Sequence, residues 1–145
     1  WEMLACRLRT AAGEVHLHAV IASRAGDDAR PGRYARMGWK PHVHVIRRPS
    51  DGRLATNTDS HMLFCAGQLC TSVVPEWVVV GTGDGDLAED LAMAVKDRHP
   101  GCRVATLSLA GSTAGRLNAA TSRVIDFNVE IGADCLRPRY TVPAC

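Results

Sequence analysis

The sequence predicts an α/β domain: a doubly wound, mainly parallel sheet with helices on both faces, in three layers of Rossmann type. Two patterns support this class. Strand-like segments alternate with helical ones along the chain, which is typical of parallel sheets with right-handed crossovers. The segment EWVVVG at 76–81 is almost wholly apolar, like a strand buried on both faces of such a sheet. With 46% hydrophobic residues, the 145-residue chain can bury one core of ordinary size.

Periodicity places each element. Period-two alternation, as in PHVHVIRR, marks the strands, and apolar residues one turn apart, such as Leu4 and Leu8, mark the helices. Helices are expected over residues 2–11, 34–37, 58–71, 86–98 and 114–120. Strands are expected over residues 14–22, 41–48, 76–81, 102–109 and 124–127. We assign residues 1–131 to one domain and residues 132–145, with Pro138 and Pro143, to an irregular tail.

Composition excludes some classes of function. No apolar run approaches the roughly 20 residues that span a bilayer, and no signal peptide opens the chain. We therefore expect no membrane association and a cytoplasmic location. The six cysteines include no C-x-x-C pair, which disfavours a zinc knuckle or a redox motif. A net charge of +2 is too small to indicate a nucleic-acid partner by itself, so function must be sought in local motifs.

The most informative motif is GTGDGDL at 81–87, directly after the apolar strand. In a parallel α/β sheet, active sites lie beyond the carboxyl ends of the strands. A phosphate-binding glycine loop is disfavoured, because Asp84 and Asp86 would face the pyrophosphate and the Walker lysine is absent. A structural interpretation makes Asp86 the N-cap of the next helix, with Glu89 completing a capping box. That interpretation leaves Asp84 unexplained.

A divalent-metal site accounts for both Asp residues. Carboxylate oxygens are the ligands that Mg²⁺ and Mn²⁺ prefer, and such an ion can activate water for phosphodiester hydrolysis. A third carboxylate is expected from Asp59, because the helix that begins there starts at the same edge of the predicted sheet. Asp59 is equally well explained as an acidic residue in the first turn of a helix.

The segment VVVGTGDGDL at 78–87 resembles the signature of the NYN family, a branch of the PIN-like nucleases. That signature is an apolar strand followed by Ser/Thr-Gly-Asp-x-Asp-Phe, and Leu87 here replaces the Phe. The stretches Ser112–Leu117 and Val124–Phe127 are similar to the family's Ser-x-x-Leu helix and its Phe-Ile-Asp-Leu end. Asp59 matches the family's acidic residue in the helix before the signature strand.

The resemblance implies a PIN-like fold and metal-dependent cleavage of RNA, with Mg²⁺ or Mn²⁺ as cofactor. It makes Asp59, Asp84 and Asp86 the catalytic and metal-binding residues, supported by Thr82 and Glu2. The resemblance is strong over residues 58–127 and weaker over residues 1–57.

The family begins with a strand that ends in Asp and is soon followed by Asn. Here Met3 stands where that Asn is usual. A first strand and its Asp are therefore expected to precede Trp1 and to lie at the centre of the sheet.

Basic residues gather between 24 and 53, and we take Arg33, Arg36, Lys40 and Arg53 as candidate RNA contacts. A solvated charged face explains them equally well. Tyr34 and Trp39 suit stacking on bases or packing against the sheet.

Two histidine pairs remain, His16 with His18 and His42 with His44, each on one face of a predicted strand. They suit a zinc or nucleotide site, although polar strand faces explain them more simply.

Two hypotheses of function follow. The first is a metal-dependent endoribonuclease acting on single-stranded or structured RNA. The alternative is an RNA-binding or regulatory module of the same fold with weak or no catalysis. The oligomeric state, including a homodimer, is left open by the sequence.

Overall fold

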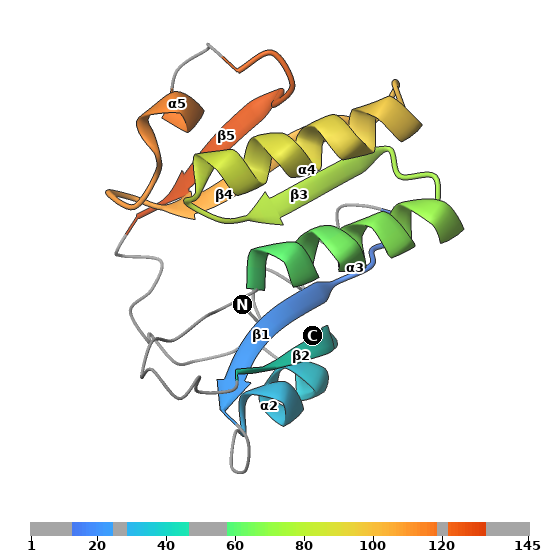
Figure 1. The fold of residues 1–145 in the computed structure, drawn as a ribbon, viewed down its shortest axis with the longest axis vertical. Helices are drawn as coiled ribbons and strands as arrows, with labels where there is room; N and C mark the ends of the chain where they lie inside the picture. The colour runs from blue at the N-terminus through green and yellow to red at the C-terminus, as the bar shows by residue number, and fades with distance from the viewer. Residues whose placement is uncertain (1–12, 25–28, 47–57, 119–121, 133–145) are drawn as a thin grey trace. The chain divides into compact units, whose positions relative to one another are not determined.

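The computed structural model describes residues 13–24, 29–46, 58–118 and 122–132. The α/β class is confirmed, because helices alternate with parallel strands along the chain (Figure 1). The strands of the described residues form two sheets, β1–β2 and β3–β4–β5, in place of the single sheet expected. The chain divides into two compact units with the boundary between Met62 and Leu63. The predictions for residues 2–11 and for the tail beyond residue 132 lie outside the described residues.

The first unit is built on two parallel strands joined by a short helix. Its elements are β1 (His18–Arg24), α2 (Arg30–Arg36) and β2 (Lys40–Ile46). The strands pair with His18 opposite Lys40 and Ala22 opposite His44, so these side chains share one face of the pair. The sequence-based bounds were wrong here: β1 begins at residue 18, and α2 occupies part of the expected loop. Pro31 explains the early start of α2, because proline suits the first turn of a helix.

The second unit alternates helices with three parallel strands. Its elements are most of α3 (Thr58–Ser72), β3 (Trp77–Gly81), α4 (Gly85–Arg98), β4 (Arg103–Leu109), α5 (Gly115–Asn118) and β5 (Phe127–Ile131). The strand order is β3–β4–β5, with Val79 opposite Ala105 and Leu107 opposite Val129. The predicted bounds of α3, β3, α4 and β4 agree with these to within one residue.

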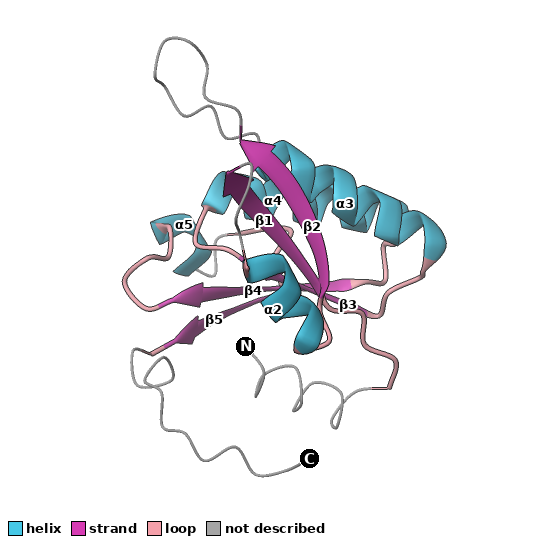
Figure 2. Cartoon of the chain, turned by 90° about the horizontal axis from the view of Figure 1, so that it is seen from below, coloured by secondary structure: helices cyan, strands magenta, loops and turns pink. Residues whose placement is uncertain are grey.

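The core of the second unit lies between α4 and one face of its sheet (Figures 1 and 2). On that face Val104 and Thr106 are fully buried and Val80 is 2% exposed. Alpha-helix α4 buries Leu91 and Val95, which lie one turn apart on one side of the helix. The hydroxyl of Thr106 donates to Asn128 Oδ1 at 2.7 Å, which satisfies a buried polar group and ties β4 to β5.

Strand β5 begins three residues later than the sequence predicts. Asp126, expected inside that strand, instead lies just before it. Its carboxylate accepts the Val104 backbone N–H at 2.7 Å and pairs with Lys96 Nζ at 2.8 Å. These bonds tie the Asp126 side chain to β4 and α4.

None of the described helices is both long and apolar enough to cross a bilayer.

Candidate functional site

The segment that follows β3, residues 82–86, is named here the acidic loop. The hydroxyl oxygen of Thr82 accepts the backbone N–H of Asp84 at 3.1 Å. Asp84 is the N-cap of α4: its Oδ1 accepts the N–H groups of Asp86 at 3.0 Å and Leu87 at 3.4 Å. The prediction that Asp86 caps this helix was wrong, because the helix begins one residue earlier, at Gly85. The third helical position is therefore Leu87, which has no polar side chain to complete a capping box with Asp84.

A second loop holds the acidic loop from the end of the neighbouring strand. The backbone N–H of Ala114 donates to the Gly83 carbonyl at 2.9 Å. The backbones of the two loops lie so close that a Cβ added to Gly83 would overlap the carbonyl oxygen of Ser112. Gly83 is thus required by contact with a neighbouring backbone, and the two strand-end loops form one rigid edge.

Hydroxyl groups fix this second loop in turn. The Ser108 hydroxyl, buried at the end of β4, lies 2.6 Å from the Thr113 hydroxyl. Ser112 donates its hydroxyl hydrogen to the Leu109 carbonyl at 2.8 Å. Ser112 was not among the site residues predicted from the sequence. The available signal was its place after β4, at the same edge as the acidic loop.

The donor set of the acidic loop fits a hard divalent cation. Asp84 and Asp86 are both exposed, and Thr82 adds a hydroxyl oxygen nearby in the same loop. All three are oxygen ligands, the type that Mg²⁺ and Mn²⁺ take. Their position at the N-terminus of α4 is one where the helix dipole favours negatively charged ligands and side chains.

The third predicted ligand stands in the other unit. Asp59 is exposed in the first turn of α3, within the part of that helix that belongs to the first unit. Within the described ranges, no group of three or more His, Cys, Asp or Glu side chains is arranged to hold a metal ion. Asp84 and Asp86 lie in one loop, where the Asp86 backbone N–H donates to the Asp84 carboxylate, and the metal site with Asp59 stays a prediction. Glu2 lies outside the described residues.

The predicted RNA contacts fall on one part of the first unit. Arg33 and Arg36 lie in the last turn of α2, and Lys40 opens β2; all three side chains are exposed. Arg53 is outside the described residues. The rings of Tyr34 and Trp39 meet edge to face with centroids 6.2 Å apart, so these two aromatic residues pack against each other.

Histidines line one face of the β1–β2 pair. His18 Nδ1 lies 2.8 Å from His42 Nε2, and the two rings stack with centroids 5.1 Å apart. The His44 ring lies 5.4 Å from that of His61 on α3. Burial, followed by the positive charges of neighbouring side chains, lowers the pKa of both His18 and His42. His16, also predicted, pairs with Glu14 at 3.2 Å.

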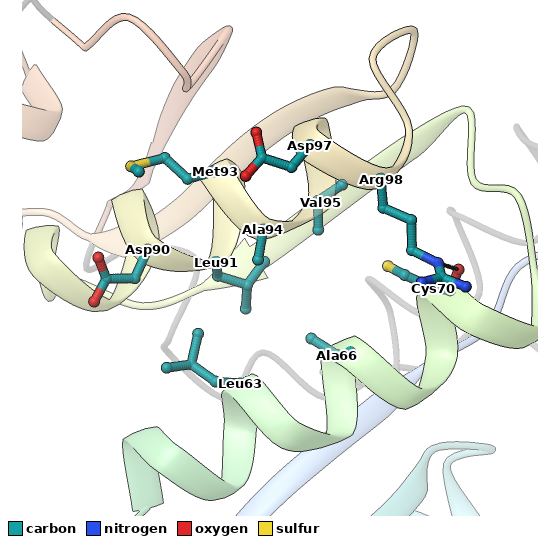
Figure 3. Close-up of a pocket in the computed structure, with 11 residues that line it drawn as sticks. Leu63, Ala66, Cys70, Asp90, Leu91, Met93, Ala94, Val95, Asp97 and Arg98 are labelled. Atoms are coloured by element: carbon teal, nitrogen blue, oxygen red, sulfur yellow. Dashed lines mark hydrogen bonds between the residues drawn. The ribbon is translucent and has the colours of Figure 1, made fainter.

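A groove of about 810 Å³ lies between α3 and α4 of the second unit. Figure 3 shows Leu63 and Ala66 of α3 facing Leu91 and Ala94 of α4 across it. At one end Arg98 donates to the Cys70 carbonyl at 3.1 Å. None of the site residues predicted from the sequence lines this groove, and it offers no oxygen cluster comparable with the acidic loop.

Comparisons with known proteins bear on the fold. No protein-family model matches the chain, and no curated protein does. The chain is similar to the crystal structure of a protein of unknown function from Vibrio parahaemolyticus RIMD 2210633. The match has a TM-score of 0.62 and 17% sequence identity, and it covers 88% of this chain and 76% of the other. At that identity the likeness shows that the two proteins share a fold.

Proposed function

We propose that the chain is a metal-dependent endoribonuclease whose reaction centre is the acidic loop. The observation that carries the proposal is the pair of exposed carboxylates, Asp84 and Asp86, fixed beyond the carboxyl end of parallel strand β3. That edge is where α/β sheets place their active sites. The resemblance of segment 78–87 to the NYN signature supports RNA as the substrate.

Each residue of the acidic loop would have a separate task. Asp84 is held in one orientation by two backbone N–H groups on Oδ1, so it would present its carboxylate to a cation with little loss of side-chain entropy. Asp86 would provide a second carboxylate from the first turn of α4. Thr82 accepts the Asp84 N–H, which leaves its own hydroxyl hydrogen to donate to a phosphate oxygen.

Asp84 and Asp86 would hold Mg²⁺ or Mn²⁺. When bound, such an ion activates water and neutralises charge on the phosphodiester. The rigid contact of Gly83 with the Ser112 loop would keep the ligands in place during the reaction.

The alternative, an RNA-binding module without catalysis, is favoured by one observation. The capping bonds of Asp84 give its carboxylate a structural task that would preserve it in the absence of any reaction.

Incubation of the purified chain with single-stranded RNA tests the proposal. Parallel samples contain Mg²⁺, Mn²⁺, or EDTA, and products are resolved on a denaturing gel. Cleavage with either metal, and its loss in EDTA and in Asp86→Asn, is expected. RNA that is bound by the folded chain but left intact with both metals supports the alternative.

A further inference from the structure

The second face of the β3–β4–β5 sheet differs in character from the face that α4 covers. Alternation and strand register assign to it the side chains of Trp77, Val79, Arg103, Ala105, Leu107, Leu109, Phe127, Val129 and Ile131. Several are large and uncovered: Trp77 is 41% exposed, Phe127 53% and Val129 50%. We name this surface the open face. Parallel sheets are usually covered on both sides, so an exposed apolar face of this kind marks a binding surface.

Two aromatic rings and one cation stand together on the open face. The Trp77 and Phe127 rings, from strands on either side of β4, approach with centroids 5.6 Å apart at 35°. Trp77 lies opposite Arg103 and Phe127 lies opposite the small, buried Ala105, so the two rings approach each other diagonally across β4. The Arg103 guanidinium lies over the Trp77 ring, 5.3 Å from its centroid. The open face thus offers flat apolar rings with a fixed positive charge beside them.

The charge of the open face indicates the chemistry of its partner. Arg103 is the single charged residue among the nine side chains assigned to it, and none is acidic. A ligand that combines flat rings with negative charge complements this arrangement. Unpaired nucleotides do so, because aromatic side chains stack on bases of any sequence and arginine contacts phosphate.

We propose that the open face binds single-stranded RNA by stacking bases on Trp77 and Phe127, with Arg103 at the phosphate backbone. The proposal rests on the ribonuclease function for its choice of RNA, and it specifies the substrate as unpaired RNA. Trp77 and Phe127 begin their strands, whereas the acidic loop follows the other end of β3. Six residues lie between Trp77 and Asp84, and the first four of them belong to β3. At about 3.3 Å per residue, bound RNA would span roughly 20 Å between stacking platform and acidic loop.

The test measures binding apart from cleavage. Binding of a fluorescent single-stranded RNA of mixed sequence is followed by anisotropy in EDTA, which withholds the metal. The variants are Trp77→Leu and Phe127→Leu, which keep an apolar side chain but remove the ring, and Arg103→Gln. Phe64→Leu, which removes an exposed ring of α3 that is not part of the open face, is the matched control, and circular dichroism checks the fold of each variant.

The expected result is binding of single-stranded RNA that weakens about tenfold in Trp77→Leu, in Phe127→Leu and at high salt, with Phe64→Leu unchanged. Duplex RNA of the same length is expected to bind more weakly than single-stranded RNA. RNA binding by folded Trp77→Leu and Phe127→Leu that equals binding by the wild type would overturn the proposal. So would a stable dimer that Trp77→Leu dissociates and that binds no RNA, because the open face would then be a protein interface.

Failure of the two proposals can be told apart. RNA binding that depends on Trp77 without metal-dependent cleavage supports the open face and contradicts the nuclease. Cleavage that depends on Asp84 and is indifferent to Trp77 and Phe127 does the reverse.

Discussion

Gly83 lies against the carbonyl oxygen of Ser112, at a separation that leaves no room for a Cβ on Gly83. This contact joins the loops that follow β3 and β4, and it holds the two carboxylates of the acidic loop in place. The same residues are therefore expected to affect both the stability of the fold and the proposed reaction. Suitable substitutions in the acidic loop measure the two effects separately.

Gly83→Ala tests the contact. The added methyl group would force the two backbones apart, and we expect the free energy of unfolding to fall by about 1–3 kcal/mol. Urea denaturation followed by circular dichroism measures the change. Gly81→Ala is the matched control, because a Cβ there meets nothing within 4 Å. Equal stability of the two variants would mean that the Ser112 loop yields freely.

Asp84 is expected to have a structural and a chemical role that different substitutions reveal. Asparagine is as good an N-cap as aspartate, so Asp84→Asn should keep the stability of the fold, whereas Asp84→Ala should lose about 1 kcal/mol. Thermal and urea unfolding of both variants measure this difference. If Asp84→Asn were as unstable as Asp84→Ala, the negative charge at the helix N-terminus would matter more than the capping bonds.

The His18–His42 contact predicts a pH dependence of the first unit. Because burial holds the pKa of both imidazoles below 6.5, the unfolded chain binds more protons than the folded chain just below that pH. Stability is therefore expected to fall as the pH drops below about 6.5. The charged groups near the pair, Lys40 and His61, act in the same direction.

Two measurements check this pH dependence. Titration of the imidazole Cε1–H resonances should give a pKa below the ordinary value for His18 and His42. Unfolding at pH 7.5 and 5.5 should show a smaller pH effect in His42→Gln than in wild type. An unchanged pH effect in that variant would assign the dependence to other groups.

Asp126 adds a further loss of stability at lower pH. Its hydrogen bond to Lys96, followed by that from the Val104 backbone N–H, lowers the pKa of the carboxyl group. The stability that it provides is present above the unfolded pKa of about 4 and is lost as the pH falls through the lower folded value. In Asp126→Asn, unfolding between pH 5 and 2 should depend less on pH than in wild type. Asp97→Asn, an exposed acid on α4, is the control.

Much of the second unit could be predicted from the sequence, for identifiable reasons. The run EWVVVG has no helical period, and the segment Gly85–Arg98 has a clear one, so β3 and α4 were placed within a residue. Strand β5 was misplaced because Val124 and Ile125 are as apolar as a strand. Just before the strand, the Asp126 carboxylate accepts the N–H of Val104, 22 residues away, and no local pattern records that bond.

The site shows the same division between local and distant information. The place of Asp84 and Asp86 after a buried strand could be read from sequence order. The identity of the N-cap depended on a one-residue shift of the helix start, which is the least predictable property of a helix. The contact between Gly83 and Ser112 required the pairing of β3 with β4. The aromatic pair on the open face depended on that register too, since Trp77 and Phe127 are 50 residues apart.

In the proposed reaction, the negative charge of the acidic loop is required for metal-dependent cleavage of RNA. The decisive experiment compares the rate of single-stranded RNA cleavage at saturating Mn²⁺ by Asp84→Asn and Asp97→Asn, purified identically. Each variant removes one exposed carboxylate, that of the α4 N-cap or that of a residue within α4, and both are expected to fold. We expect a rate at least about 100-fold below wild type for Asp84→Asn and a wild-type rate for Asp97→Asn. Equal rates for the two variants would contradict it and place any cleavage outside the acidic loop.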